Sequence, residues 1–346
     1  MTSFVAAPAL RHQFFAVARS VDVAPGPIGV TLLGTPVVLF RDAVGTVGAL
    51  PDRCPHREMP LSRGLVGVFG NLVCGYHGWA YASDGACVSI PSSHATATPA
   101  QARLRPFAVR ERYGLVWVAL DDPVAEPPAV PQDDDPGFRR VVAPTEHWAC
   151  AATRMVDNFC DIAHFPFVHA GTFGAGSPEQ VPGFAIEALD ANFRGYRYDV
   201  DVANPEAARI ASGQDAGTVR RRMTTGFALP TTVRSTIRYE PDAHGHVLEH
   251  VLLLCSTPVS DERSLFTFVV WRNDGSTLPD EEVIAFDRAI GAEDKVALEQ
   301  VPGTLPLESD ALAANALVSV QADRCSVAWR RAFAALVAGT ADDTVA

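Results

Sequence analysis

Two cysteines and two histidines lie close together in the first third of the chain, with a spacing that suits a metal centre. One residue separates Cys54 from His56, and seventeen residues further on Cys74 and His77 follow with two residues between them. Two thiolates and two imidazoles hold either a tetrahedral zinc ion or a [2Fe-2S] cluster with both cysteines on one iron and both histidines on the other. Because each segment carries one cysteine and one histidine, the pattern favours the cluster.

A second patch of polar residues follows in the middle of the chain. The spacing of apolar residues predicts a helix over 153–165. At about 100° per residue, Asn158, Asp161 and His164 fall within an arc of about 120° on that helix. These three side chains are therefore expected to share one face.

A proline and a second histidine come directly after this predicted helix. Pro166 lacks an N–H group and clashes with the preceding turn, so we expect it to break the helix and bring His169 back towards His164. Two imidazoles and one carboxylate with open positions form the facial triad that binds mononuclear Fe(II). The alternative is that both histidines are core or interface residues at the end of a helix.

The carboxylate of such a triad has to come from elsewhere in the chain. Apolar residues predict an amphipathic helix over about 280–300, and Asp287 and Asp294 lie on its apolar face, with Glu293 towards the edge. A carboxylate facing a core is costly unless it binds a metal or pairs with a cation. Asp287 and Asp294 are therefore the two candidates.

The elements that must position these residues differ along the chain. Short strands broken by turn residues occupy the first part, and 123–137, rich in proline and acidic residues, reads as a linker. Beyond it we expect a mixture of helices and strands, with a last helix over 319–337. The predicted strands are 195–202, 218–227, 232–239, 247–255 and 265–271. The histidines at 244, 246 and 250 are expected in a hairpin turn.

Composition excludes several classes of protein. The net charge of −12 disfavours nucleic acid and anionic membrane surfaces as partners. No apolar run reaches 18 residues, so no transmembrane helix is expected. The N-terminus lacks the pattern of a secretory signal, which favours a cytoplasmic protein. Seven cysteines, an odd number spread over a long chain, do not form a disulfide framework. Those outside the cluster segments are expected in the core: Cys87, Cys150, Cys160, Cys255 and Cys325.

Two motifs resemble a known family. The spacing C-x-H-x17-C-x2-H, followed by Gly78 and Trp79, is similar over 49–89 to Rieske proteins, and N-x2-D-x2-H-x4-H from Asn158 to His169 resembles the catalytic motif of Rieske non-haem iron oxygenases. The segment 293–295 resembles the stretch that supplies the aspartate ligand in the members without a β subunit, such as the vanillate, dicamba and purine-alkaloid demethylases. This resemblance selects Asp294.

The resemblance also implies roles for two further residues. Asp161 matches an aspartate that connects an iron-ligating histidine of its own subunit with a cluster histidine of the neighbour, here His77, in a head-to-tail homotrimer. Asn158 matches a residue near the iron.

The fold that the resemblance implies is α+β. An all-β Rieske [2Fe-2S] domain over 1–130 is expected to precede a catalytic domain over 131–346, with a mononuclear iron on a curved antiparallel sheet with helices, of the helix-grip or START-like type. The cofactors are one [2Fe-2S] cluster and one Fe(2+) per subunit.

The implied function is that of a terminal oxygenase in a multicomponent system. Electrons from NAD(P)H arrive through a separate ferredoxin or flavin reductase, and O2 supplies one oxygen atom that hydroxylates or O- or N-demethylates a small aromatic or heterocyclic substrate. Ring dihydroxylation to a cis-dihydrodiol is the alternative reaction. A Rieske electron carrier is disfavoured, because carriers lack the second motif and the roughly 200 residues after the linker.

Overall fold

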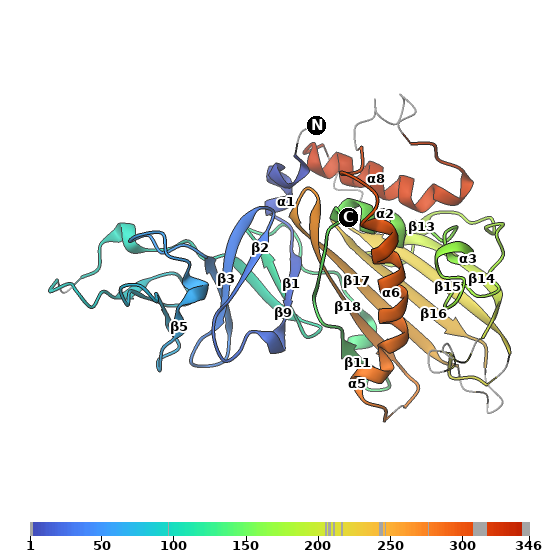
Figure 1. The fold of residues 1–346 in the computed structure, drawn as a ribbon, viewed down its shortest axis with the longest axis horizontal. Coiled ribbons are helices and arrows are strands. Elements are labelled where there is room, and N and C mark those ends of the chain that lie inside the picture. Colours follow the sequence, from blue (N-terminus) through green and yellow to red (C-terminus); the bar gives the residue numbers. More distant parts are fainter. Residues whose placement is uncertain are drawn as a thin grey trace. The chain divides into compact units, whose positions relative to one another are not determined.

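The computed structural model describes residues 3–340 except 96, 205, 207, 208, 210, 211, 216, 242–244, 246, 276 and 307–316. The chain forms two compact units, Met1–Pro127 and Pro128–Ala346, and the division falls within the proline-rich segment 123–137. Figure 1 shows strands in both units and the longer helices in the second.

The first unit consists of three small antiparallel sheets, with strand orders β1-β10-β9, β2-β3-β4 and β5-β6-β7-β8. The strands are β1 Phe15–Arg19, β2 Ile28–Leu32, β3 Thr35–Arg41, β4 Val47–Pro51, β5 Leu65–Val66, β6 Leu72–Val73, β7 Ala80–Tyr81, β8 Cys87–Ser89, β9 Ala108–Arg112 and β10 Leu115–Ala119. Short helical turns lie at α1 Pro8–Arg11, η1 Phe4–Ala6, η2 Ser20–Asp22, η3 Leu61–Arg63 and η4 Ala100–Ala102.

A buried cluster joins the second and third of these sheets. Phe40, Leu50 and Leu61 pack with Tyr81 and with the cysteines of both cluster segments. The two segments are therefore fixed to one hydrophobic core, although they are far apart in sequence.

The second unit is built on an eight-stranded antiparallel sheet with the order β11-β18-β17-β16-β15-β14-β13, and β12 also pairs with β18. The strands are β11 Arg139–Val142, β12 Glu146–Trp148, β13 Glu187–Ala188, β14 Arg194–Ala203, β15 Thr218–Ala228, β16 Thr232–Tyr239, β17 Glu249–Ser260 and β18 Arg263–Arg272. Its five long strands match the predicted strands to within a few residues, because their sequences alternate buried and exposed positions or are apolar throughout.

Among its described residues, the second unit has the helices α2 Ala152–Phe159, α3 Phe165–Val168, α5 Asp280–Val283, α6 Ala285–Leu298 and α8 Arg324–Val337, with short turns η5 Pro131–Asp133 and η6 Gln321–Asp323. Figure 1 shows α6 crossing in front of the long strands. Buried aromatic and apolar side chains, including Trp148, Met155 and Phe266, hold α2, α5 and α6 to the sheet.

Two helix predictions need correction. The helix predicted over 153–165 ends at Phe159, because Asp161 accepts hydrogen bonds from the backbone N–H groups of Ala163 and His164 and so forms a turn in place of helix. Pro166 does not break a helix but lies in the first turn of α3, where its missing N–H is tolerated.

The helix predicted over 280–300 is divided at Ile284 into α5 and α6.

The hairpin turn expected for His250 also needs correction. His250 lies in strand β17 and is 1% exposed, whereas positions 244 and 246 lie outside the described residues. The five cysteines expected in the core are buried, as predicted.

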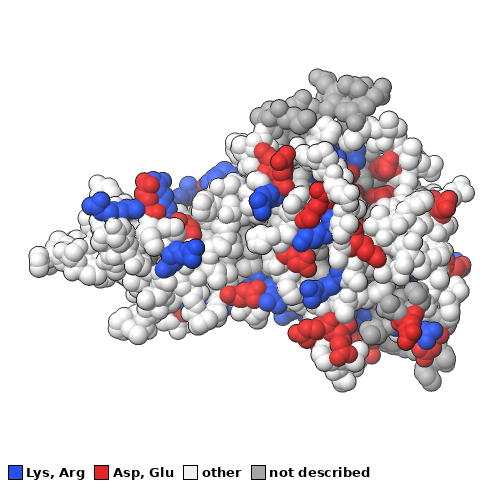
Figure 2. Space-filling model, viewed as in Figure 1, with Lys and Arg blue, Asp and Glu red and all other residues white. Residues whose placement is uncertain are grey.

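The surface carries mixed charges. Basic and acidic side chains are interspersed over the face seen in Figure 2. Within the part of the chain that the structure describes, no helix is both long enough and apolar enough to span a bilayer.

Candidate metal centres

The two cysteine–histidine segments of the first unit form loops with the same backbone closure. In the first loop the N–H of Cys54 donates to the carbonyl of Met59, and the N–H of Glu58 donates back to the carbonyl of Cys54. The second loop repeats both bonds, from Cys74 to Trp79 and from Gly78 to Cys74. The fifth residue of each loop has a positive φ, 60° at Glu58 and 72° at Gly78. The sequence therefore builds two matching ligand-bearing turns on one core.

The side chains of these loops are gathered at one place. The rings of His56 and His77 have centroids 4.4 Å apart, and the indole of Trp79 stacks on His56 at 4.7 Å. Cys54 and Cys74 are both buried, with exposures of 1% and 2%. The buried Nδ1 of His56 has no hydrogen-bond partner among the described residues. Two adjacent thiols and two adjacent imidazoles, one with an unsatisfied buried nitrogen, fit the ligand set of a [2Fe-2S] cluster.

A tyrosine lies directly behind the first cysteine. The hydroxyl of Tyr81, which is 0% exposed, lies 3.3 Å from Sγ of Cys54. Burial is the main cause that raises the pKa of both groups. Desolvation and the positive charges of His77 and Arg57 lower the pKa of His56, which favours the neutral imidazole that a metal requires.

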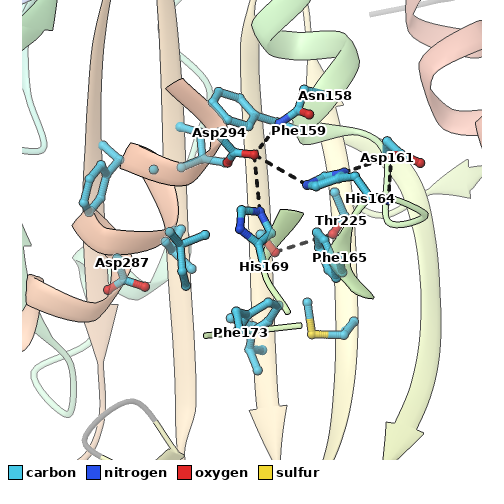
Figure 3. A pocket seen from close by; sticks show the side chains of 18 of the residues that line it. Asn158, Phe159, Asp161, His164, Phe165, His169, Phe173, Thr225, Asp287 and Asp294 are labelled. Atoms are coloured by element: carbon cyan, nitrogen blue, oxygen red, sulfur yellow. Dashed lines mark hydrogen bonds and ion pairs between the residues drawn. The ribbon is translucent and has the colours of Figure 1, made fainter. Parts of the chain in front are cut away.

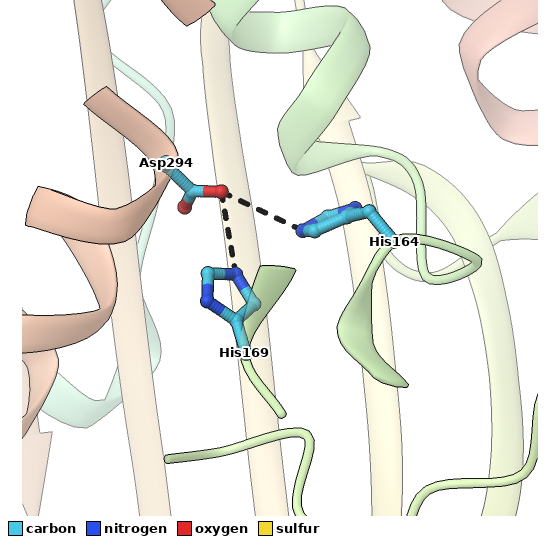
Figure 4. A group of neighbouring side chains, drawn as sticks. All are labelled: His164, His169 and Asp294. Carbon is cyan, nitrogen blue, oxygen red and sulfur yellow. Dashed lines mark ion pairs between the residues drawn. The ribbon is translucent and has the colours of Figure 1, made fainter. Parts of the chain in front are cut away.

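The second unit brings together three side chains, His164, His169 and Asp294, which are called the trio below. Their ligand atoms all lie within 4.8 Å of one another, and within the described residues no other group of three such side chains does so. Oδ1 of Asp294 is 3.3 Å from Nε2 of His169 and 3.6 Å from Nε2 of His164 (Figure 4). Two imidazole nitrogens and a carboxylate oxygen that converge on one point are the donor set of a mononuclear Fe(II) site.

Asp161 orients His164. Its Oδ2 lies 2.8 Å from Nδ1 of His164, and both carboxylate oxygens accept backbone N–H groups of the turn. Burial raises the pKa of Asp161, but the hydrogen bonds with His164 and the turn outweigh burial and leave the pKa lowered. The ionised carboxylate therefore holds the proton of His164 on Nδ1 and leaves Nε2 free for a metal.

Glu293 orients His169 in the same way. Its Oε2 lies 2.7 Å from Nδ1 of His169 and accepts a hydrogen bond of 2.7 Å from the hydroxyl of Thr172. His169 is 1% exposed. Burial lowers its pKa, but the hydrogen bonds and charges of Asp294 and Glu293 prevail and raise it. Nε2 of His169 is thus also the nitrogen that faces the carboxylate of Asp294.

The loop after His169 can fold this tightly only because it contains a glycine. The N–H of Gly174 donates to the carbonyl of His169, and a Cβ at this position would lie 1.8 Å from the carbonyl oxygen of Phe165. Any side chain there would push the loop away from the ligand.

The carboxylate of Asp294 is also held by a hydrogen bond from α2. The amide of Asn158, near the end of α2, donates to Oδ1 of Asp294 at 2.9 Å. Asp294 is 5% exposed and lies two helical turns along α6 from Asp287, the other candidate. Asp287 contacts His250 instead, with Oδ1 3.1 Å from Nε2, and is not part of the trio.

The end of α2 is anchored to two other elements. Arg330 of α8 makes two 2.6 Å hydrogen bonds with the carboxylate of Asp157, and Ser326 donates to the carbonyl of the same residue. Tyr196 of β14 donates to the carbonyl of Cys160.

A cavity of about 100 Å³ lies beside the trio in the second unit. Figure 3 shows His164, His169 and Asp294 in the middle of the lining side chains and Asp287 apart from them on α6. Most of the lining is apolar and aromatic, including Phe159, Phe165, Phe266 and Phe268. Such a lining suits a small planar ring placed next to a metal.

The structure gathers every predicted site residue of each unit into one place. Glu293, Thr172 and Tyr81 were not predicted. Glu293 lies next to the predicted ligand Asp294, but its angle on the helix placed it at the edge of the apolar face. No sequence pattern shows that the loop 169–174 packs against that edge.

Two protein families match the chain. The Rieske [2Fe-2S] domain matches residues 13–103, and the vanillate O-demethylase oxygenase C-terminal domain matches residues 148–339. The first match contains both cysteine–histidine loops, and the second contains the trio.

Known proteins are similar over nearly the whole chain. Methylxanthine N1-demethylase NdmA of Pseudomonas putida is 32% identical over 88% of this chain and 81% of its own length. The solved structure of Pseudomonas putida CBB5 NdmA with caffeine has a TM-score of 0.80 at 27% identity and covers 97% of this chain and 96% of that one. Dicamba monooxygenase bound to 3,6-dichlorosalicylic acid has a TM-score of 0.78 at 25% identity, with 95% and 98% covered.

Proposed function

The chain belongs to the Rieske oxygenases of the vanillate O-demethylase type, and on that premise we propose that it removes a methyl group from, or hydroxylates, a small aromatic or heterocyclic substrate. The observation that carries this proposal is the trio of His164, His169 and Asp294 at the wall of an aromatic cavity. The protein acts as the oxygenase component of a system in which another protein supplies the electrons.

We assign the ligands residue by residue. Cys54 and Cys74 bind one iron of the [2Fe-2S] cluster and His56 and His77 bind the other, in agreement with the paired loops. The trio holds one Fe(2+). When bound, the two cofactors would supply electrons and activate O2, so that one oxygen atom enters a C–H bond of the substrate and the other, with two electrons from the reductase and two protons, leaves as water.

The residues around the trio have separate tasks. Asp161 and Glu293 hold the imidazoles with Nε2 towards the metal, and Asn158 restrains the carboxylate of Asp294. The phenylalanines of the cavity exclude water and leave room for a flat ring with a methyl group directed at the trio. Oxidation of an O- or N-methyl group gives a hemiacetal or carbinolamine that releases formaldehyde.

Demethylation is favoured over ring dihydroxylation. NdmA, a relative matched over 81% of its own length, is named as an N-demethylase, and the second matched family takes its description from an O-demethylase. We further propose a head-to-tail homotrimer, a ferredoxin or flavin reductase fed by NAD(P)H as electron donor, and a cytoplasmic location, where NAD(P)H is available.

The cofactor assignments can be tested on the purified protein. Anaerobic preparations should be brown and contain about two inorganic sulfides per chain for the cluster. Cys54→Ser should abolish the cluster spectrum, and Cys87→Ser, a buried cysteine outside both loops, should retain it. Zinc without sulfide in the wild-type protein would contradict the assignment.

The reaction can be tested with a surrogate reductase. Methoxy- and N-methyl-arenes are incubated with NADH and O2, and formaldehyde is quantified against substrate consumed. One formaldehyde per substrate supports demethylation, and His164→Ala should yield none. A cis-dihydrodiol without formaldehyde would favour the alternative reaction.

A further inference from the structure

Asp287 presents a buried carboxylate oxygen for which the described residues provide no hydrogen-bond partner. The residue is 8% exposed and lines the cavity beside the trio, and its Oδ2 is buried and unpaired. A buried acceptor left without a donor is costly, so such groups usually have a partner in the functional state.

The other oxygen of this carboxylate is held firmly. Oδ1 of Asp287 lies 3.1 Å from Nε2 of His250, whose Nδ1 lies 3.1 Å from Nη1 of Arg272. Arg272 in turn pairs with Asp274 at 2.6 Å. Because Asp274 offsets the positive charge of Arg272, this series of side chains holds the carboxylate of Asp287 in place without neutralising its negative charge. A fixed and charged acceptor of this kind can select a ligand.

The helix sets the position of Asp287 relative to the trio. Asp287 and Asp294 are seven residues apart on α6, which places them on the same face with a rise of about 10 Å between them. Gly291 and Ile290 line the cavity between them. The two carboxylates therefore lie at different places along the wall of one cavity, so that a ring with one end at the trio can present its other end to Asp287.

We propose that Asp287 selects substrates that carry an N–H or O–H donor at the end of the ring opposite the methyl group that is oxidised. The inference rests on the proposed function and deepens it, since it names the substrate class of the same cavity. A carboxylate at that end of the ring would face the charge of Asp287 and be rejected, and a ring without a donor would leave Oδ2 unpaired.

Four probes with one scaffold separate these cases. 4-Methoxyphenol and 4-methoxybenzylamine have a donor para to the methoxy group, 1,4-dimethoxybenzene has none, and 4-methoxybenzoate has a carboxylate. Binding to the anaerobic, fully loaded protein is measured by calorimetry without reductant, so no turnover is needed. We expect the two donor probes to bind about 10- to 100-fold more tightly than the other two.

Variants connect that order to Asp287. Asp287→Asn is nearly isosteric and can donate as well as accept, so it should lower the preference for phenol over benzoate by about tenfold or more. Asp199→Asn is the control, because it removes an exposed carboxylate that pairs with Arg222 and does not line the cavity, and it should change that ratio by less than about threefold. Iron and sulfide contents verify that each variant is folded and loaded.

Three results would overturn the inference. The first is equal binding of all four probes, the second is an unchanged ratio of phenol to benzoate affinity in Asp287→Asn, and the third is no measurable binding of either donor probe. The proposed function fails separately, through absence of iron, cluster or formaldehyde, because the binding order is measured without oxygen or electrons.

Discussion

Nε2 of His169 and Oδ1 of Asp294 lie 3.3 Å apart, and both side chains are almost fully buried. Each atom carries a lone pair directed at the same small volume, into which His164 also points. Such an arrangement requires a cation between the groups, either a proton or a metal. Asp294 and Glu293 raise the pKa of His169 for this reason, and the proposed iron would take the place of the proton.

The identity of the third ligand gives the first prediction. Asp294→Ala should remove mononuclear iron and activity and leave the cluster spectrum intact, because the cluster loops belong to the other compact unit. Asp287→Ala, on the same face of α6, should retain iron. Iron is measured per chain alongside the visible spectrum. Loss of iron in Asp287→Ala with retention in Asp294→Ala would reverse the assignment.

The second prediction concerns pH. Asp294 and Glu293 raise the pKa of His169 above its ordinary value of 6.5, and below the raised pKa the ring is protonated and cannot bind a metal. The apparent affinity for Fe(II) should therefore fall as the pH decreases below the raised pKa, by up to about tenfold per pH unit. Anaerobic Fe(II) titrations between pH 8 and pH 6 test this. An affinity that is constant over that range would contradict it.

The third prediction isolates Glu293. Glu293→Gln keeps the length of the side chain but removes the charge that holds the proton on Nδ1 of His169. Loss of such a partner typically weakens metal binding by about 10- to 100-fold. With less negative charge nearby, the pKa of His169 should also be lower, so the loss of affinity on acidification should begin at a lower pH than in the wild type. Glu299→Gln is the matched control, because the carboxylate of Glu299 accepts a hydrogen bond from the backbone N–H of Ala149 and does not contact His169.

How far the sequence predicts this site depends on the kind of contact. Periodicity marked Asp287 and Asp294 as acids on an apolar helix face, the resemblance of segment 293–295 selected Asp294, and the two histidines follow from local spacing. Glu293 was missed because its role depends on a loop from another part of the chain. His250 was placed in a turn because nothing local shows that Asp287, on α6, would partner a histidine of β17.

The fold shows the same distinction. The long strands were predicted from alternation, but the end of α2 at Phe159 was not, because Asp161 uses its carboxylate for a turn where helical periodicity would have continued. Side-chain to backbone hydrogen bonds of aspartate compete with the helix in a way that apolar spacing does not register.

The fourth prediction concerns the cluster. The hydroxyl of Tyr81 lies 3.3 Å from Sγ of Cys54, and a hydrogen bond to a cluster sulfur stabilises the more negative, reduced state. A difference of about 1 kcal/mol corresponds to about 40 mV for one electron. Tyr81→Phe should therefore lower the reduction potential by this order with the cluster retained, as measured by spectroelectrochemical titration. A raised or unchanged potential would show that the hydroxyl does not bond to the sulfur.

The fifth prediction tests the route of electrons between subunits. In the proposed homotrimer, Asp161 connects His164 of its own subunit with His77 of the partner subunit, so that the cluster of one chain serves the iron of the next. Asp161 lies 2.8 Å from His164, its side chain is 21% exposed, and the ring of His77 is partly exposed. A carboxylate can accept further hydrogen bonds beyond those that it makes within its own chain.

Asp161→Asn is nearly isosteric and should preserve folding and both cofactors, but it removes the charge that would hold the two histidines. Partners of metal-bound histidines commonly contribute about 10- to 100-fold, so single-turnover oxidation of a reduced cluster by substrate and O2 should slow at least that much. Asp199→Asn, which removes an exposed carboxylate paired with Arg222, is the control and should react at the wild-type rate. Since the route requires a closed ring of subunits, sedimentation of the active enzyme should show a trimer. An active monomer, or wild-type turnover in Asp161→Asn, would refute the route.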